Sequence, residues 1–429
     1  MVARLRGGVP SRRRAGPRTS DRSLCMVVHG PYPIGEPRVA RQARAAFEAG
    51  FDVDVVATRR DGEPPTEVVD GVRVFRLPVE HRRGGGVFQV LREYLGFTAL
   101  ATFHVARLSA DRRYSVVQIH NPPDFLIAAA IFPKLQGARI VFDVHDLSPD
   151  LFASRFEGRR GGAVLDAALC WTERLATRLA DAVITVHEPY RQVLSARSVS
   201  ASKVTVVMNS LDESLLPQAP ARREGSDFRV FYHGTVTAWY GLELLVDAFS
   251  SILTARPHAR LEIQGEGDAI TAVRDRAEAL SISSHVSAPG SYLPQADVLA
   301  LAQGAGVGVI PNLPTRLNRY ALSSKLFEYV ALGIPVVSAD LPTIRAHFDD
   351  SEIRYFRAGD AESLAEALLD VARYPHDAAE RVAAARARYQ EYRWPGNAAR
   401  YLALLEAERP VHRESSEEAQ PVYPEGTSN

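Results

Sequence analysis

The feature that most constrains this chain is a repeated alternation of short apolar runs with longer segments of helical periodicity. The run 24–30 (LCMVVHG) is followed by the amphipathic segment 38–50, and the run 228–234 (FRVFYHG) by the amphipathic segment 241–256. Runs that are apolar at successive positions predict strands buried on both faces, as in parallel sheets covered by helices on each side. The sequence therefore predicts an α/β protein with two doubly wound, Rossmann-like domains that face a central cleft.

The same pattern extends along most of the chain. The expected strands are 24–30, 51–59, 68–78 (a hairpin with an edge strand), 115–120, 138–145, 181–188, 203–210, 228–234, 259–265, 307–312 and 334–340. The expected helices are 38–50, part of 82–110 after a mobile loop, 190–195, 241–256, 268–280, 323–333, 363–375 and one long helix at about 377–406. Ligands of such sheets bind at the carboxyl ends of the strands, so a cleft between the two domains is the expected active site.

At 429 residues the chain is too long for one typical core, and two domains are expected. The predicted division, in chain order, is 1–22 (a disordered, Arg-rich start), 23–216 (an acceptor-binding domain), 217–227 (a linker), 228–385 (a donor-binding domain), 386–408 (a helix that is open to crossing back to the first domain) and 409–429 (a disordered tail).

Composition excludes several classes of protein. Net charge is zero, which argues against a nucleic-acid partner. Cys25 and Cys170 are far apart in the sequence, so a disulfide is not expected and a reducing compartment is. The sequence shows no cluster of Cys and His residues, so no metal or other cofactor is expected. The first twenty residues lack the apolar stretch of a secretory signal, and no run is long enough to span a membrane. The expected location is cytoplasmic, with a peripheral contact at the inner face of the membrane left open.

The segment 323–340 (SSKLFEYVALGIPVVSAD) carries the clearest chemical signal. Lys325 and Glu328 lie one turn apart near the start of a predicted helix that ends at Gly333. A helix N-terminus with an ammonium group suits a diphosphate, and the carboxylate suits two ribose hydroxyls. The alternative is an ordinary αβ unit with solvated charges. Lysine occurs only three times in the chain, which favours a specific role for this one.

Taken together, several segments resemble retaining glycosyltransferases of family four, which have the GT-B fold of two Rossmann-like domains. They are 117–126 (VQIHNPPDFL), 140–152 (IVFDVHDLSPDLF), 178–194, 204–216, 231–249 (FYHGTVTAWYGLELLVDAF) and 323–340. The resemblance runs from about residue 24 to 406, and its strength lies in the order and spacing of these segments. It implies that a nucleotide-sugar donor binds mainly to the second domain and an acceptor mainly to the first.

The resemblance also implies roles for individual residues on the donor side. Glu328 would bind the ribose, and Lys325 would face the diphosphate. The remaining donor-binding residues are, in chain order, Gly234 and Thr235 at the diphosphate, Gly265 and Glu266 beside the nucleotide, and Tyr292 near the base. The loop at Gly234 precedes a helix, so its N–H groups offer an anion site independently of the resemblance.

On the acceptor side, the resemblance implies that His145 contacts the transferred sugar. The alternative is a strand-end histidine that is hydrogen-bonded to backbone. Asp146 is an equal candidate for a catalytic base or a turn cap. Gly30, His120 and Asn121 are expected to line the acceptor side, with a tight turn or a structural role as their alternatives. No metal is expected in the reaction.

Three positions depart from the pattern of many family members. Thr235 and Tyr240 stand where those members carry an arginine and a lysine, and Tyr320 stands in place of a first glutamate. The loss of the two basic residues at Thr235 and Tyr240 weakens the expected diphosphate clamp. The tyrosine at position 320 removes a carboxylate expected at the sugar. As a hypothesis, Arg316 or Arg319 supplies the missing positive charge.

The predicted activity is transfer of a sugar from a nucleotide to a glycan, lipid-linked or small-molecule acceptor, with retention of the anomeric configuration. The segment 82–110 combines arginines with apolar residues and would suit a lipid-linked acceptor, or else packs on the sheet. The alternatives are a nucleotide-sugar epimerase, an inverting mannosyltransferase that acts on lipid-linked chitobiose, and a non-catalytic nucleotide-sugar-binding scaffold.

Overall fold

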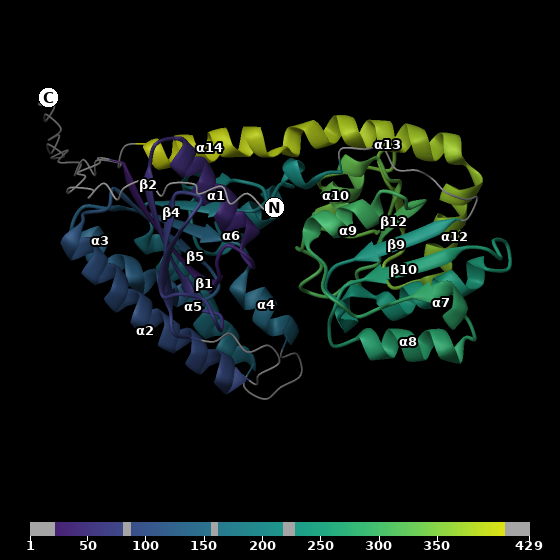
Figure 1. Cartoon of the computed structure of the whole chain (residues 1–429), viewed down its shortest axis with the longest axis horizontal. Helices are drawn as coiled ribbons and strands as arrows, with labels where there is room; N and C mark the ends of the chain where they lie inside the picture. The colour runs from purple at the N-terminus through teal and green to yellow at the C-terminus, as the bar shows by residue number, and fades with distance from the viewer. Residues whose placement is uncertain (1–21, 80–86, 156–161, 218–227, 408–429) are drawn as a thin grey trace, which may run out of the picture.

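The structure is a computed structural model that describes residues 22–79, 87–155, 162–217 and 228–407. Two α/β lobes lie side by side, and a pair of C-terminal helices runs across both (Figure 1). The predicted fold class is confirmed. The predicted disordered ends, almost all of the predicted linker and the loop before the helix at 87 lie outside the described residues.

The first lobe is built on an eight-stranded sheet in the order β3-β4-β2-β1-β5-β6-β7-β8. All neighbouring strands are parallel except β3 and β4, which form the predicted hairpin at the sheet edge. Every residue of β5 is buried, as expected of a strand that is covered on both faces. The strands are β1 (Ser23–Pro31), β2 (Asp52–Thr58), β3 (Thr66–Val69), β4 (Val72–Leu77), β5 (Val116–His120), β6 (Arg139–Val144), β7 (Ala182–Thr185) and β8 (Val204–Val206).

Helices cover both faces of this sheet (Figure 1). They are α1 (Pro37–Glu48), α2 (Val87–Asp111), α3 (Ile131–Leu135), α4 (Ser148–Arg155), α5 (Gly162–Leu179) and α6 (Glu188–Arg197). The sequence patterns did not predict α3, α4 or α5. The first two are short, and a short apolar stretch cannot be assigned to helix by periodicity alone.

The second lobe is built on a six-stranded, fully parallel sheet in the order β11-β10-β9-β12-β13-β14. Its strands are β9 (Arg229–His233), β10 (Arg260–Gln264), β11 (Val286–Ser287), β12 (Val307–Ile310), β13 (Val336–Ala339) and β14 (Arg354–Phe356). Its helices are α7 (Leu242–Ile252), α8 (Ile270–Ala279), α9 (Gln295–Ala302), α10 (Ser324–Leu332), α11 (Pro342–Arg345) and α12 (Ala361–Arg373).

Each sheet has one point at which the strand order changes direction. In the first sheet β1 lies between β2 and β5, and in the second sheet β9 lies between β10 and β12. Ligands of open α/β sheets bind beyond the carboxyl ends of the strands at this point. The loops that begin at Tyr32, Asn121 and Gly234 follow β1, β5 and β9, and therefore occupy the two switch points. Gly30 is the last but one residue of β1.

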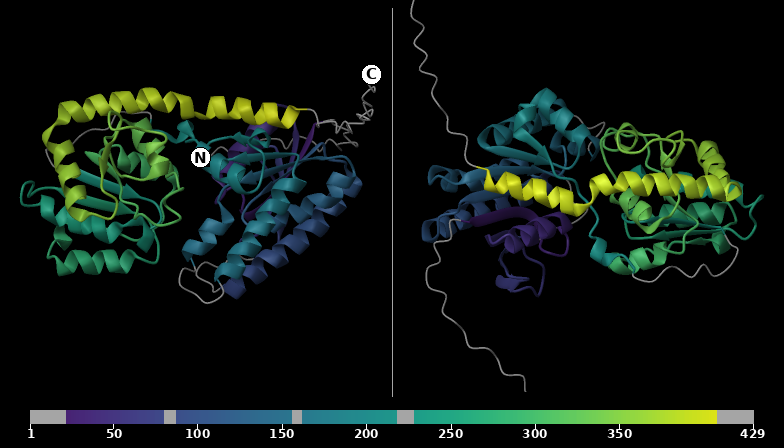
Figure 2. Two further views of the ribbon diagram at one scale, coloured as in Figure 1. Left: turned by 180° about the vertical axis from the view of Figure 1, so that it is seen from behind. Right: turned by 90° about the horizontal axis from the view of Figure 1, so that it is seen from above.

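The C-terminal part was predicted as one long helix, and this is wrong. The structure has α13 (Pro375–Tyr389), a 3₁₀ turn (Gln390–Tyr392) and α14 (Trp394–Glu406). Pro395 explains the break, because proline lacks an N–H and is tolerated only in the first turn of a helix. Tyr401 and Leu405 of α14 belong to the core of the first lobe, so the two helices link the lobes (Figure 2).

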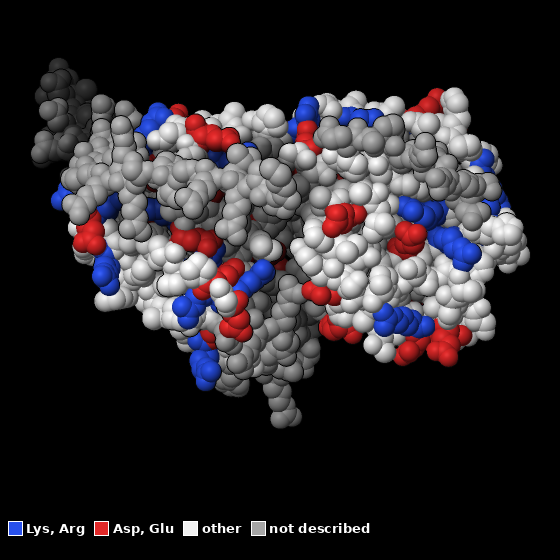
Figure 3. All heavy atoms as spheres, viewed as in Figure 1, with Lys and Arg blue, Asp and Glu red and all other residues white. Residues whose placement is uncertain are grey.

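Within the described residues, no helix combines the length and apolar character needed to cross a membrane. Figure 3 shows one face of the molecule, where basic and acidic side chains of the described residues alternate rather than gather by sign.

Candidate functional site

A cavity of about 310 Å³ lies at the carboxyl ends of the strands of the second sheet. All seven residues that the sequence predicts for donor binding line it, namely Gly234, Thr235, Gly265, Glu266, Tyr292, Lys325 and Glu328. They come from the loop after β9, the loop after β10, the segment before α9 and the first turns of α10. The fold thus brings four separate parts of the sequence to one site.

Two glycines allow the loops of this cavity to pack backbone to backbone. Gly234 has φ +108° and Gly265 has φ +152°, both in the region that side chains disfavour. A Cβ atom on Gly265 would lie 1.9 Å from the Gly234 carbonyl oxygen, and one on Gly234 would lie 2.7 Å from Lys325 Cε. Glycine at both positions is therefore required for the loops and the lysine to approach each other.

Lys325 is the cation of the cavity. Its Nζ lies 5.1 Å from the ring centroids of both Tyr232 and Tyr240, which supply cation–π contacts. Burial lowers the pKa of Lys325 to about 8, and nearby Glu328 partly opposes this effect. Among the residues that the structure describes, no carboxylate forms an ion pair with this ammonium group. It is therefore available to an anionic ligand.

Glu328 is held in place by two neighbours. Its Oε2 lies 2.9 Å from His233 Nε2, and Gln295 Nε2 donates a hydrogen bond of 2.9 Å to its Oε1. Burial alone would raise the pKa of Glu328, but His233, Lys325 and Gln295 outweigh it and leave the pKa below its usual value. The carboxylate is thus ionised and oriented, as binding of vicinal hydroxyls requires.

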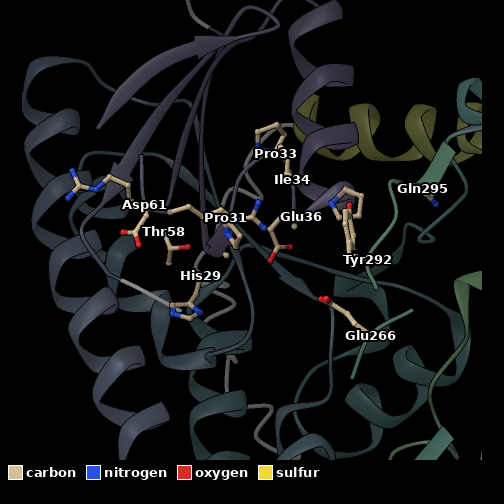
Figure 4. A pocket seen from close by; sticks show the side chains of 15 residues that line it. His29, Pro31, Pro33, Ile34, Glu36, Thr58, Asp61, Glu266, Tyr292 and Gln295 are labelled. Carbon is tan, nitrogen blue, oxygen red and sulfur yellow. The ribbon is translucent and has the colours of Figure 1, made fainter. Parts of the chain in front are cut away.

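A second and larger cavity of about 920 Å³ lies between the two lobes. Figure 4 shows His29, Glu36 and Thr58 on the side of the first lobe, and Glu266 and Tyr292 on the side of the second lobe. Three residues, Glu266, Tyr292 and Gln295, line both cavities, so the two spaces adjoin. An acceptor in the larger cavity would meet a donor in the smaller one.

Glu36 is one of two acidic residues of the first lobe that line this cavity, together with Asp61. It precedes α1, and its Oε1 is so close to Gly30 that a Cβ there would lie only 2.0 Å away. Burial raises the pKa of Glu36 to about 7; His145 lowers it and Asp146 raises it. These influences place Glu36 near the two predicted catalytic residues.

His145 itself does not line either cavity. Its Nε2 lies 3.0 Å from His120 Nδ1, and both nitrogens are within 3.6 Å of Asp143 Oδ2. Although burial alone would raise it, the pKa of Asp143 is held well below the usual range by the Arg38 guanidinium and the histidines. Burial lowers the pKa of His120 to about 4. The structure thus holds the His145 Nε2 against His120 and Asp143 rather than in the wall of either cavity.

His120, Asp143 and His145 bring ligand atoms within 4.8 Å of one another, as a metal site would require. However, Asp143 Oδ2 already accepts hydrogen bonds from Gln42 Nε2 at 2.8 Å and Arg38 Nε at 3.2 Å. A divalent ion would replace these bonds and lie beside a guanidinium. The group is better described as a buried hydrogen-bonded network.

Asn121 and Asp146 also lie beside the cavities rather than in their walls. Asn121 Oδ1 accepts hydrogen bonds from the backbone N–H groups of His145 (2.7 Å) and Asp146 (3.3 Å). Its Nδ2 donates to Asp124 Oδ1 and to the Asp146 carbonyl, each at 2.8 Å. Asn121 therefore ties the end of β5 to the end of β6. Burial raises the pKa of Asp146.

The two arginines suggested as substitutes for the missing clamp do not line either cavity. Arg316 reaches across to the first lobe, where its Nε lies 2.8 Å from Asp150 Oδ1. Arg319 lies over the ring of Tyr320 at 6.0 Å. Tyr240, which stands in place of a lysine, contributes its ring to Lys325 instead.

The sequence patterns missed three residues of the site: Glu36, His233 and Gln295. His233 is the last residue of an apolar strand, where the pattern gives no sign of a site, yet it lines the smaller cavity and contacts Glu328. The motif GEP around Glu36 lies in a loop whose path no periodicity predicts. Gln295 is remote in sequence from Glu328, so their contact is a product of the tertiary fold.

Comparison with known families agrees with this geometry. Residues 35–210 match the family described as Glycosyl transferase 4-like domain, and residues 227–373 match Glycosyl transferases group 1. The chain belongs to the 4-like, group 1 glycosyltransferases that these two matches describe. It is a nucleotide-sugar-dependent, retaining glycosyltransferase with the GT-B fold, as the sequence predicted, rather than an epimerase or a non-catalytic scaffold.

Individual relatives cover nearly the whole chain. A phosphatidyl-myo-inositol mannosyltransferase of Mycobacterium leprae is 28% identical over 383 residues, which are 88% of this chain and 95% of the relative. The structure of sucrose-phosphate synthase from Thermosynechococcus elongatus superposes with a TM-score of 0.71 at 17% identity, covering 89% of this chain and 98% of that one. The structure of Anabaena HepE in complex with UDP superposes with a TM-score of 0.66 at 14% identity, covering 90% of this chain and 99% of that one.

Proposed function

We propose that the 310 Å³ cavity binds the nucleotide sugar with Glu328 on the ribose hydroxyls and Lys325 on the diphosphate. Thr235 and the N–H groups of the Gly234 loop complete the diphosphate site, and Gly265 and Glu266 lie along the nucleotide. Tyr292, which lines both cavities, lies near the base. The bound diphosphate supplies the partner that the Lys325 ammonium lacks among the described residues.

In this proposal the acceptor enters the larger cavity from the first lobe. Its hydroxyl oxygen bonds to the anomeric carbon as the bond from that carbon to the diphosphate oxygen breaks. The acceptor proton passes to the departing diphosphate on the same face of the sugar. His145 and Asp146 shape the electrostatics of this centre, with Gly30 allowing the loop after β1 to approach and His120 and Asn121 fixing the strand ends.

The observation that carries the proposal is the convergence of all seven predicted donor residues on one cavity that adjoins a larger one. Calorimetric titration with UDP, GDP, ADP and dTDP tests it, with Glu328→Ala as the control. Selective binding of one nucleotide that is lost in the variant supports the proposal. Absence of binding by all four would refute the assignment of this cavity.

We propose further that the first lobe makes a peripheral contact with a membrane from the cytoplasmic side. Along α2, Leu91, Leu95 and Phe103 follow one another at spacings of four or eight residues and are exposed, whereas Val90, Tyr94 and Phe97 face the core. Ile131 and Leu135 of α3, a helix that contacts α2, are exposed as well. An exposed apolar helix face beside arginines suits the lipid interface, and the Mycobacterium leprae relative is named for a lipid acceptor.

A further inference from the structure

The larger cavity has two chemically different ends. Figure 4 shows Thr58 and Asp61 at the end formed by the loop after β2, Glu36 in the middle, and Glu266 and Tyr292 at the end that adjoins the donor cavity. A ligand that fills this space therefore has one end next to the donor cavity and the other end against the loop after β2.

Arg59 and Arg60 line the end remote from the donor. In the part of the chain that the structure describes, neither guanidinium has an ion-pair partner. The acidic residue closest to them in the chain beyond Asp61 is Glu63, whose Oε2 lies 3.2 Å from Arg76 Nε and accepts the Arg60 backbone N–H at 2.9 Å. Glu63 is thus engaged, and the two guanidinium groups remain without a protein carboxylate.

The loop that carries these arginines has a fixed backbone. The Arg59 N–H donates to the Leu77 carbonyl at 3.0 Å, and the Glu63 N–H donates to the Arg60 carbonyl at 3.2 Å. Asp61 in the same turn balances one of the two positive charges, which leaves a surplus of one. Guanidinium groups bind phosphate oxygens with paired hydrogen bonds, so this end is suited to a phosphate group.

We propose that the larger cavity binds an acceptor that carries a phosphate at the Arg59–Arg60 end and hydroxyl groups beside Glu36, in the middle of the cavity. Glu36 accepts a hydrogen bond from an acceptor hydroxyl and so directs it toward the donor sugar. This inference rests on the proposed function, because it concerns the acceptor of the same reaction. The phosphate belongs either to a free sugar or cyclitol phosphate or to a lipid headgroup.

Calorimetry of the full chain tests the proposal without added nucleotide. The probes are glucose 6-phosphate and myo-inositol 1-phosphate, compared with glucose and myo-inositol. Vesicles of phosphatidylcholine with and without phosphatidylinositol test the lipid source. The variants are the double substitution of Arg59→Gln and Arg60→Gln, the two single substitutions, and Glu36→Gln. Arg113→Gln is the matched control, because Arg113 is an exposed arginine just before the opposite, amino end of β5.

We expect at least one phosphorylated probe to bind about ten-fold or more tightly than its unphosphorylated counterpart, because hydrogen bonds to charged groups are strong. The double arginine variant removes this preference, Glu36→Gln weakens both kinds of probe, and Arg113→Gln changes neither. A preference seen only with phosphatidylinositol vesicles identifies the lipid headgroup. No preference in any arm, or one that survives the double variant, overturns the proposal. Failure of the unaltered chain to bind any nucleoside diphosphate would instead refute the proposed function.

Discussion

At the scale of single residues, the proposed donor site makes the charge of Lys325 a determinant of nucleotide affinity. Burial lowers its pKa to about 8, so the ammonium is largely protonated at pH 7 and largely neutral at pH 9. The terminal phosphate of a nucleoside diphosphate has its second pKa near 6, so it gains little further charge over this range and binds the charged form of the lysine. We therefore expect its Kd, measured by calorimetry, to rise about ten-fold from pH 7 to pH 9.

Lys325→Gln separates this effect from other titrations. The variant should bind nucleotide more weakly than the unaltered chain at pH 7, and its Kd should stay flat up to pH 9. A variant that kept the full pH dependence would show that another group is responsible.

Gly265 offers a test of how tightly the two loops of the donor cavity are packed. In Gly265→Ala the new Cβ would lie 1.9 Å from the Gly234 carbonyl oxygen in a backbone with φ +152°. We expect a loss of about 3 kcal/mol in stability and loss of nucleotide binding, measured by chemical denaturation and calorimetry.

Gly96→Ala is the control, because Gly96 lies in α2 with no atom within 4 Å of an added Cβ. That change should stabilise by about 0.5–1 kcal/mol. Equal effects of the two substitutions would contradict this account.

At the scale of elements, most strands were predictable, whereas the short edge strands β11 and β14 and several helix boundaries were not. Strands such as β5 and β9 are apolar throughout because both faces are covered, and this leaves a direct signal in the sequence. Pro395 marks the break between α13 and α14 in the sequence. The prediction of one long helix followed the apolar periodicity, which continues across this proline. The orientation of α4 and α5 depends on tertiary contacts, which no local pattern reports.

The exposed stripe of α2 leads to a prediction for this element. Leu95 is 52% exposed and Phe103 is 71% exposed, so replacing both with glutamate should leave the core face of the helix intact. We expect Leu95→Glu with Phe103→Glu to weaken binding to vesicles that contain phosphatidylglycerol by about ten-fold, in a co-sedimentation assay, since the apolar contact with lipid is lost. Tyr374→Glu is the control, because Tyr374 is also exposed but lies on the second lobe. Equal losses in both variants, or none, would remove the support for this face.

At the scale of the whole molecule, α14 joins the C-terminus to the centre of the first lobe. The Tyr401 hydroxyl donates to Gln118 Oε1 at 2.7 Å, and Gln118 Nε2 lies 3.2 Å from Asp143 Oδ2. The last helix of the described residues is thus part of the network that holds His120 and His145. The residues that line the smaller cavity were named from the sequence because the resemblance rests on contiguous segments, whereas this network and the Glu36 site assemble from distant segments. Their absence from the sequence-based prediction follows from that difference.

The ion pair between the lobes separates two accounts of Arg316. In the structure its Nε lies 2.8 Å from Asp150 Oδ1, so it connects the lobes rather than completing the donor cavity. We expect Arg316→Ala to leave nucleotide affinity within about two-fold but to favour separation of the lobes, since a half-exposed ion pair contributes up to about 1 kcal/mol. Asp150 keeps its contact with Arg197 at 2.8 Å, so the first lobe itself is not left with an unpaired buried charge.

Calorimetry and small-angle scattering measure these two effects on the same samples. Arg357→Ala is the matched control, because Arg357 is an exposed arginine of the second lobe that pairs only locally, with Asp360. The radius of gyration should increase for Arg316→Ala and not for the control, and added salt should reduce the difference, because salt screens the pair in the unaltered chain. A loss of nucleotide affinity of about ten-fold or more would instead mean that Arg316 leaves Asp150 and reaches the diphosphate, as expected for a direct charge-assisted contact. The substitute clamp suggested by the sequence would then hold, and the contact with Asp150 would belong to the donor-free state of the enzyme.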